Sequence, residues 1–288
     1  MRVGAVLLLL AVTCIAHAEA TEGESGLRLV SLNPSLTAIA LSLGAGDALV
    51  GVDDFSARQQ PAVAERPRVG GLWNPSLEAV VALEPDLVVL VPSVEQRDFT
   101  NRLEALGISV ATFENLRFGQ VLENIERMGG LLGRPERAHE RIASIKRARS
   151  RLEALTSGRE PPATVVVLQR DPLFVVGGGS FVEEMLRAAG GRNVASGFSE
   201  PYPRVDIEWL VAAAPDVLVD MAPDASAARA FWSRWPSLPA VSNGRVLALD
   251  PRLVTLPGPH LDRGMWALAE AIHEPPLPAA TPGKGVSR

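Results

Sequence analysis

Two glutamates occupy equivalent places in a segment that the chain repeats. Glu78 and Glu208 each lie seven residues before a Pro-Asp pair that opens an apolar, β-branched run. The two copies, residues 77–89 and 207–219, are 130 residues apart. Each glutamate falls in the first turn of an expected short helix, where a carboxylate suits the helix dipole. Two such carboxylates, one in each half, can also pair with arginines of a partner that has matching two-fold character.

Residues that could break or form bonds are scarce. The histidines are His17 near the start, His139 and His273 in expected helices, and His260 in a Pro-rich loop, while Cys14 is the only cysteine. No HExxH or GxSxG motif occurs. Neither a Ser-His-acid triad nor a zinc site is therefore expected. The sequence predicts a protein that is not an enzyme and holds no metal or cofactor, with an envelope hydrolase as an alternative.

A few aromatic residues fall beside the ends of expected strands, where α/β folds bind ligands. These are Phe55, Trp73, Phe174 and Tyr202. Aromatic faces suit a large, rigid, partly apolar ligand. Packing explains each residue equally well on its own, but the set favours a ligand-binding cleft. Arg204, two residues after Tyr202, and His260 are polar candidates for the same cleft, and Arg170 is a further source of positive charge.

The elements around these residues alternate between strands and short helices, which predicts parallel α/β sheets. From about residue 118 to 155 the rhythm changes, because apolar residues recur at helical spacing and no strand signal occurs. Gly133-Arg134-Pro135 interrupts that pattern, so this part is one long helix or two in succession. The predicted fold is α/β, with two lobes of mainly parallel sheets flanked by helices and joined by a long backbone helix. The expected limits are 27–117 for the first lobe, 118–160 for the connecting helix, 161–273 for the second lobe and 274–288 for a disordered tail.

The first 18 residues have the features of a cleaved signal peptide. Arg2 is followed by an apolar stretch at residues 6–12 and by the small-x-small pattern Ala16-His17-Ala18. A lipoprotein anchored through Cys14 is disfavoured, because Thr13 is a poor residue before a lipidated cysteine. The remaining chain has no cysteine, which suits a soluble protein of the bacterial periplasm. The net charge of −5 is spread without a basic stripe, so no nucleic-acid partner is expected.

Several motifs together resemble the helical-backbone (class III) periplasmic substrate-binding proteins of ABC importers. They are LVSLNPSLT at 29–37, GAGDALVGV at 44–52, GGGSF at 177–181, AGGRN at 189–193 and PGP at 257–259, together with the repeated Pro-Asp segments. Proteins of this family serve importers of vitamin B12, ferric siderophores and haem, and the vitamin B12 branch is the most similar. The resemblance runs from about residue 27 to 272. It implies a ligand held between two lobes, with little closure.

The resemblance also implies roles for the candidate residues. Phe55, Phe174 and Tyr202 fall on positions of aromatics that surround the corrinoid, and Trp73 lies within about one residue of another. Apart from the resemblance, we expect Arg204 and His260 to add polar contacts, and the loop position of His260 makes it a candidate contact to the metal of the ligand. Glu78 and Glu208 match the glutamates that dock onto arginines of the membrane permease.

The chain departs from the family where Arg-Pro-Gly-Pro-Arg is common, because it has Leu256-Pro257-Gly258-Pro259-His260 instead. The loss of both arginines disfavours an anionic siderophore. The sequence therefore predicts a monomeric periplasmic protein that captures cobalamin or another corrinoid and delivers it to an ABC importer permease. A protein of the same class that binds a ferric siderophore or haem is the alternative.

Overall fold

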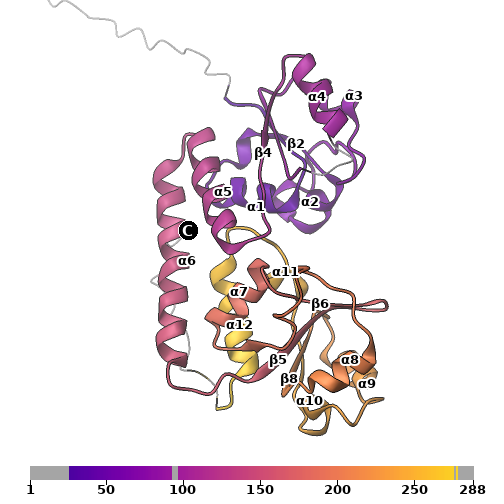
Figure 1. The fold of residues 1–288 in the computed structure, drawn as a ribbon. Helices are drawn as coiled ribbons and strands as arrows, with labels where there is room; N and C mark the ends of the chain where they lie inside the picture. Colours follow the sequence, from indigo (N-terminus) through magenta and orange to yellow (C-terminus); the bar gives the residue numbers. More distant parts are fainter. Residues whose placement is uncertain (1–25, 93–96, 276, 278–288) are drawn as a thin grey trace, which may run out of the picture.

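The computed structural model describes residues 26–92, 97–275 and 277, and it contains two α/β lobes with a long helix along one side (Figure 1). The predicted fold class is confirmed. The expected signal peptide and most of the expected tail lie outside the described residues. Leu277, inside that tail, is buried against the core. Among the described residues, no helix is both long enough and apolar enough to cross a membrane.

The first lobe is built on a four-stranded parallel sheet with the order β2-β1-β3-β4. Its strands are β1 (Leu29–Ser31), β2 (Leu49–Val52), β3 (Leu87–Leu90) and β4 (Ser109–Thr112). Its helices are α1 (Pro34–Ser42), α2 (Asp54–Gln59), α3 (Leu77–Val81) and α4 (Arg97–Ala105), with short 3₁₀ turns at Gly46–Ala48 and Pro61–Val63.

The second lobe repeats this order, because β7-β5-β8-β9 follows the same path, and it adds the antiparallel strand β6 beside β5. Its strands are β5 (Ala163–Arg170), β6 (Leu173–Val175), β7 (Arg192–Asn193), β8 (Val217–Asp220) and β9 (Val246–Ala248). Its helices are α7 (Phe181–Ala188), α8 (Ile207–Ala213), α9 (Ala225–Trp232), α10 (Pro239–Ser242), α11 (Pro251–Val254) and α12 (Leu261–Ile272).

The aspartate of each Pro-Asp pair makes the same contacts in both lobes. The carboxylate of Asp86 accepts a hydrogen bond from the N–H of Arg28 at 2.8 Å, and the Asp86 N–H donates to the Arg28 carbonyl at 2.9 Å. Asp216 does the same with Ala163, at 3.0 and 2.7 Å. Each aspartate thus joins the start of a central strand to its neighbour. The sequence repeat is therefore a structural repeat.

The connecting segment contains two helices, α5 (Phe118–Leu131) and α6 (Pro135–Thr156). They are separated by Gly133, whose positive φ of 62° favours glycine. The second helix runs beside both lobes (Figure 1). Arg137 and Arg141 lie one turn apart on α6. Arg137 donates to the carbonyl of Leu43 in the first lobe, and Arg141 forms an ion pair with Asp262 of α12. These two arginines join α6 to both lobes.

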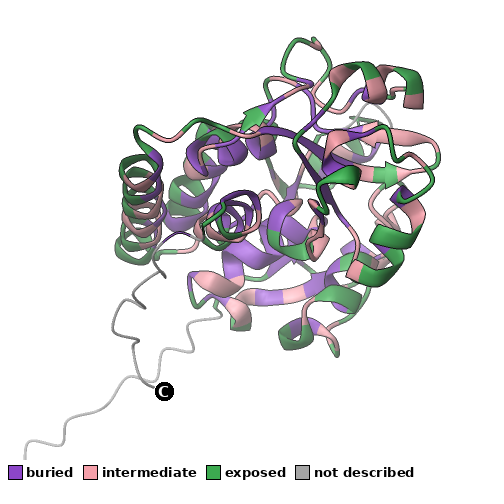
Figure 2. Cartoon of the chain, turned by 90° about the horizontal axis from the view of Figure 1, so that it is seen from below, coloured by how far each residue is buried: buried purple, intermediate pink, exposed green. Residues whose placement is uncertain are grey.

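The apolar core continues from one lobe to the other. One buried cluster includes Leu36 of α1, Ile125 of α5, Ile145 of α6 and Met265 of α12. Buried strands lie at the centre of the molecule with exposed helix faces around them (Figure 2). Because burial of apolar surface is the main stabilising term in folding, this shared core resists separation of the lobes.

Candidate functional site

Two adjoining cavities lie between the lobes, and together we call them the cleft. The first has a volume of about 350 Å³ and takes its walls from both lobes, including Phe55, Leu72 and Arg252. The second, of about 280 Å³, is lined by Leu168, Tyr202 and other residues of the second lobe. Three residues line both cavities, and they are Asn115, Thr255 and Pro257. The cleft therefore lies where the chain crosses between the lobes.

The first-lobe wall of the cleft depends on the caps of two helices. Asn33 accepts a hydrogen bond from the N–H of Ser35 at 2.9 Å and so begins α1. Asp53 accepts from the N–H groups of Phe55 at 2.8 Å and Ser56 at 3.0 Å and begins α2. Phe55 therefore lies in the first turn of α2, shortly after the end of β2. Phe55 is 37% exposed.

A buried polar network lies behind Phe55. The Ser56 hydroxyl donates to the carboxylate of Asp53, which is fully buried. Thr37 lies 2.9 Å from the Ser56 hydroxyl and 2.8 Å from that of Ser31. Burial raises the pKa of Asp53, and hydrogen bonds from Ser56 and Phe55 partly oppose this shift. The network fixes α2 against α1 and so orients Phe55.

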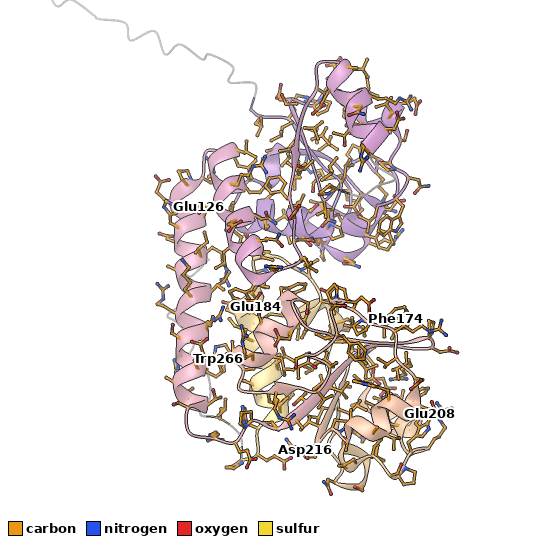
Figure 3. All side chains as sticks on the ribbon, viewed as in Figure 1. Glu126, Phe174, Glu184, Glu208, Asp216 and Trp266 are labelled. Carbon is orange, nitrogen blue, oxygen red and sulfur yellow. The ribbon has the colours of Figure 1, made fainter. Side chains whose placement is uncertain are left out.

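Three predicted residues of the second lobe come together on one ribbon. Residues 201–205 run antiparallel to β6, with the N–H of Val175 donating to the Pro203 carbonyl at 3.1 Å. Phe174 and Arg204 form a bridge in this ribbon. Because side chains alternate between faces, Phe174, Arg204 and Tyr202 share one face. Phe174 thus lies within the short strand β6, on the side of its lobe nearest the first lobe (Figure 3).

Tyr202 remains a neutral phenol over the physiological range. Burial raises its pKa to about 12. Its side chain lines the second cavity, where a phenol offers both an aromatic face and a hydrogen-bond donor.

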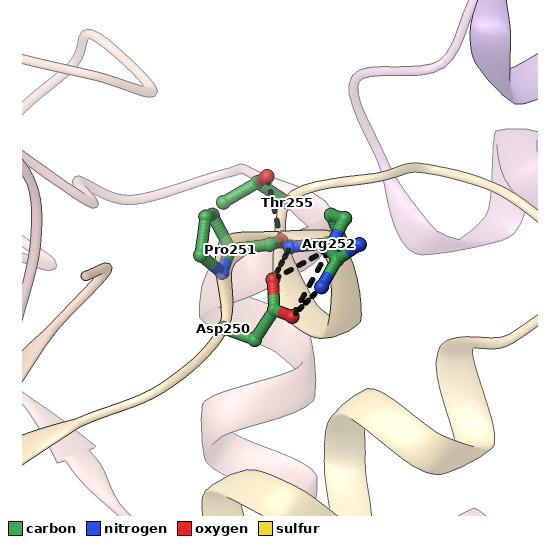
Figure 4. Close-up of polar contacts among 4 residues, drawn as sticks. All are labelled: Asp250, Pro251, Arg252 and Thr255. Carbon is green, nitrogen blue, oxygen red and sulfur yellow. Dashed lines mark hydrogen bonds and ion pairs between the residues drawn. The ribbon is translucent and has the colours of Figure 1, made fainter. Parts of the chain in front are cut away.

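Sequence reasoning missed the ion pair between Asp250 and Arg252 (Figure 4), of which Arg252 lines the first cavity of the cleft. Arg252 donates through Nε to both carboxylate oxygens of Asp250, at 3.1 and 3.0 Å, and through Nη2 at 2.6 Å. Its N–H also donates to Asp250, which caps α11. Hydrogen bonds from Arg252 lower the pKa of Asp250. An aspartate followed by Pro251 is a helix-start signal that could have indicated α11.

Of the six predicted ligand contacts, four do not line either cavity of the cleft, and they are Trp73, Phe174, Arg204 and His260. Trp73 is 67% exposed on the turn after Gly70, although its neighbour Leu72 does line the first cavity. His260 begins α12 and lines a third cavity of about 390 Å³, which shares Gln59 and Leu256 with the first. Although His260 is exposed overall, partial burial of its ring and then the nearby arginines lower its pKa. Their roles as ligand contacts stay predictions.

The paired glutamates lie in the first turns of α3 and α8, and both are exposed. Each helix has a side-chain cap, Ser76 in α3 and Asp206 in α8. A hydrogen bond at its own backbone, followed by one from the Ser76 hydroxyl, lowers the pKa of Glu78. Both helices lie on the side of the molecule opposite α6, and Glu208 projects from the outer edge of its lobe (Figures 1 and 3).

The described residues offer no cluster of side chains suited to a metal ion. Within residues 26–92, 97–275 and 277, no group of three or more histidine, cysteine, aspartate or glutamate side chains is placed to hold a metal ion. Arg170, a second candidate for positive charge, forms an ion pair with Asp220 at 2.8 Å, so its charge is compensated.

Comparison with known proteins identifies the class. A family model described as periplasmic binding protein matches residues 29–253. The vitamin B12-binding protein of Vibrio parahaemolyticus is 27% identical over 233 residues, covering 81% of this chain and 84% of that protein. An uncharacterised ABC transporter substrate-binding lipoprotein of Bacillus subtilis is 30% identical over 255 residues, covering 85% of this chain and 80% of that protein.

Two solved structures share the fold over most of the chain. The periplasmic vitamin B12-binding protein of Vibrio cholerae has a TM-score of 0.75 at 25% identity and covers 85% of this chain and 96% of its own. A periplasmic haem-binding protein from Pseudomonas aeruginosa has a TM-score of 0.75 at 30% identity, with 88% and 95% covered. Such relatives are substrate-binding proteins rather than enzymes, and they carry transported ligands rather than cofactors. The chain therefore belongs to the periplasmic binding protein family, in the class that binds vitamin B12, haem or siderophores and near its vitamin B12 branch.

Proposed function

We propose that this protein captures cobalamin or a related corrinoid in the cleft and delivers it to an ABC importer permease. The observation that carries the proposal is the chemistry of the cleft lining. Amide and hydroxyl side chains, including Asn33, Gln59, Asn115 and Thr255, alternate with apolar and aromatic groups. A corrinoid presents a large rigid ring bordered by neutral carboxamides, and such a lining can both pack against the ring and hydrogen-bond its edge.

The charges around the cleft favour a neutral ligand. Among the described residues that line its two cavities, Arg252 has the only formal charge at neutral pH, and Asp250 compensates it. A ferric siderophore or haem often bears carboxylates, which are most strongly bound by uncompensated arginine. The cleft therefore supports a corrinoid better than either anion.

Few groups of the described cleft lining could ligate haem iron. The lining contains Tyr202 and no histidine. His260 lines the third cavity rather than the cleft. Haem remains the second candidate, because a haem-binding protein is among the structures most like this one, at 30% identity.

Delivery would use the paired glutamates. Glu78 and Glu208 are exposed and equivalent in the repeat, and their helices α3 and α8 lie on the same side of the molecule (Figure 1). We propose that they pair with arginines on the permease, one from each lobe. The spacing is held because α5, α6 and α12 share one core with both lobes.

Location and assembly complete the proposal. We propose that residues 1–18 are a signal peptide, that the chain acts in the periplasm as a monomer, and that its units are residues 27–117, 118–160 and 161–273. Purification from the native envelope fraction tests the ligand assignment directly. A corrinoid absorption spectrum in the purified protein supports it, whereas a haem Soret band or a siderophore charge-transfer band contradicts it.

A further inference from the structure

The geometry of the ion pair between Asp250 and Arg252 suits discrimination between neutral and anionic groups of a ligand. Arg252 lines the first cavity, and its guanidinium is fixed by two side-chain nitrogens on the carboxylate of Asp250. Guanidinium carries five N–H donors in a planar fork. The bonds to Asp250 use Nε and Nη2, so the donors on Nη1 are available to a ligand. Arg252 thus presents hydrogen-bond donors to the cavity while its charge is compensated by Asp250 from outside the cavity lining.

A neutral primary carboxamide suits this arrangement. Its carbonyl can accept from the Nη1 donors of Arg252 and needs no uncompensated positive charge. A carboxylate on the ligand has acceptors only, so it gains the arginine but meets the like charge of the aspartate. Like charges placed together disfavour binding, and much of the gain from the arginine is cancelled.

We propose that Asp250 and Arg252 are a specificity-determining pair that selects ligand carboxamides over carboxylates at this wall of the cleft. This inference rests on the proposed function and assigns a part of its selectivity to two residues. The local fold supports it, because Asp250 also caps α11 through the N–H of Arg252 at 2.9 Å. One side chain therefore both positions Arg252 and compensates its charge.

The substitution Asp250→Asn separates these two roles. Asparagine is as good a helix cap as aspartate, so α11 is retained. The substitution removes the negative charge and leaves Arg252 uncompensated. Its matched control is Asp224→Asn, because Asp224 caps α9 through the N–H groups of Ser226 and Ala227 and is absent from the cleft lining.

The test compares cyanocobalamin with its monocarboxylic acid derivatives, in which one side-chain amide is hydrolysed. The wild type binds the amide form more tightly than at least one acid isomer. Asp250→Asn improves binding of that acid relative to the amide by about two- to fivefold, the size expected for a partly exposed charge pair. Arg252→Gln on top of Asp250→Asn removes the improvement, and Asp224→Asn leaves the ratio unchanged.

The outcomes separate this inference from the proposed function. Corrinoid binding with the same acid-to-amide ratio in the wild type and in Asp250→Asn overturns the pair as a selective element and leaves the function standing. Absence of corrinoid binding overturns the function, and the same variants are then compared with protoporphyrin IX and its neutral dimethyl ester. If Asp250→Asn binds the free acid more tightly relative to the ester than the wild type does, the inference is supported. An unchanged ratio of acid to ester affinity, or no binding of either porphyrin, overturns it.

Discussion

Phe55 and Arg252 line the same cavity although they belong to different lobes. Phe55 lies in the first turn of α2, which Asp53 caps, and Arg252 lies in the first turn of α11, which Asp250 caps. Each lobe therefore uses an aspartate-capped short helix to bring a side chain to the cleft. Neither lobe alone forms this site, so the binding properties depend on how the lobes are joined.

The aromatic walls should contribute directly to ligand affinity. Phe55→Ala and Tyr202→Ala each remove a ring from a cavity lining. We expect each to weaken corrinoid binding by about 1 kcal/mol, roughly fivefold, which is typical of one lost aromatic contact. Equilibrium titration with cyanocobalamin measures the loss. Leu131→Ala, an exposed apolar residue of α5 outside both cavities, is the control and should bind as the wild type does.

Docking should be separable from ligand binding. Reversing Glu78 and Glu208 to arginine should abolish uptake through the permease, because each would then meet an arginine of like charge. Affinity for the ligand should not change, since neither residue lines the cleft cavities. Glu126→Arg is the control, because Glu126 is exposed on α5, near the opposite side of the molecule (Figure 3). Loss of affinity in the reversed variant would instead assign the two glutamates to ligand binding.

The buried carboxyl of Asp53 should make stability depend on pH. Its raised pKa means that the folded protein holds this proton more strongly than the unfolded chain does. The favourable contribution is therefore complete below the unfolded pKa and is lost as pH rises through the folded pKa. We expect the free energy of unfolding of the wild type, relative to Asp53→Asn, to increase between pH 7 and pH 4. Urea unfolding of both proteins across this range measures the difference, and a decrease on acidification would contradict it.

The contacts of α6 should matter for stability. Arg141 forms an ion pair with Asp262 and donates to the carbonyl of Pro259 at 2.5 Å, and both charged side chains are largely buried. Arg141→Ala leaves Asp262 without its partner, so we expect a loss of about 2 kcal/mol in unfolding free energy. Arg147→Ala, at an exposed position of the same helix, should change it by less than about 0.5 kcal/mol. Equal losses in the two variants would show that the ion pair contributes nothing specific.

The sequence could predict those features that depend on local patterns. The helix-then-strand unit around Glu78 recurs around Glu208, and the structure has both glutamates in first turns. The break at Gly133 is also a local signal, and it does separate two helices. Short-range periodicity and capping residues carry this information within a few positions.

The arrangement of the cleft needed tertiary contacts that no local pattern contains. The six-residue helix α2 is too short for a periodic signal, and its cap Asp53 accepts from the Ser56 hydroxyl, which in turn contacts Thr37 of α1. Phe174 reaches Tyr202 and Arg204 only because β6 pairs with a segment far along the chain. Arg252 was missed because its cleft position follows from packing of the second lobe against the first.

Binding of cyanocobalamin against haemin tests the central claim most directly. In equilibrium dialysis, each ligand is followed by its visible absorption with the purified chain on one side of the membrane. The account predicts saturable, stoichiometric binding of cyanocobalamin at micromolar concentration or below, and haemin binding that is weaker. Stoichiometric binding of haemin with no retention of cyanocobalamin would contradict the assignment of a corrinoid to this cleft.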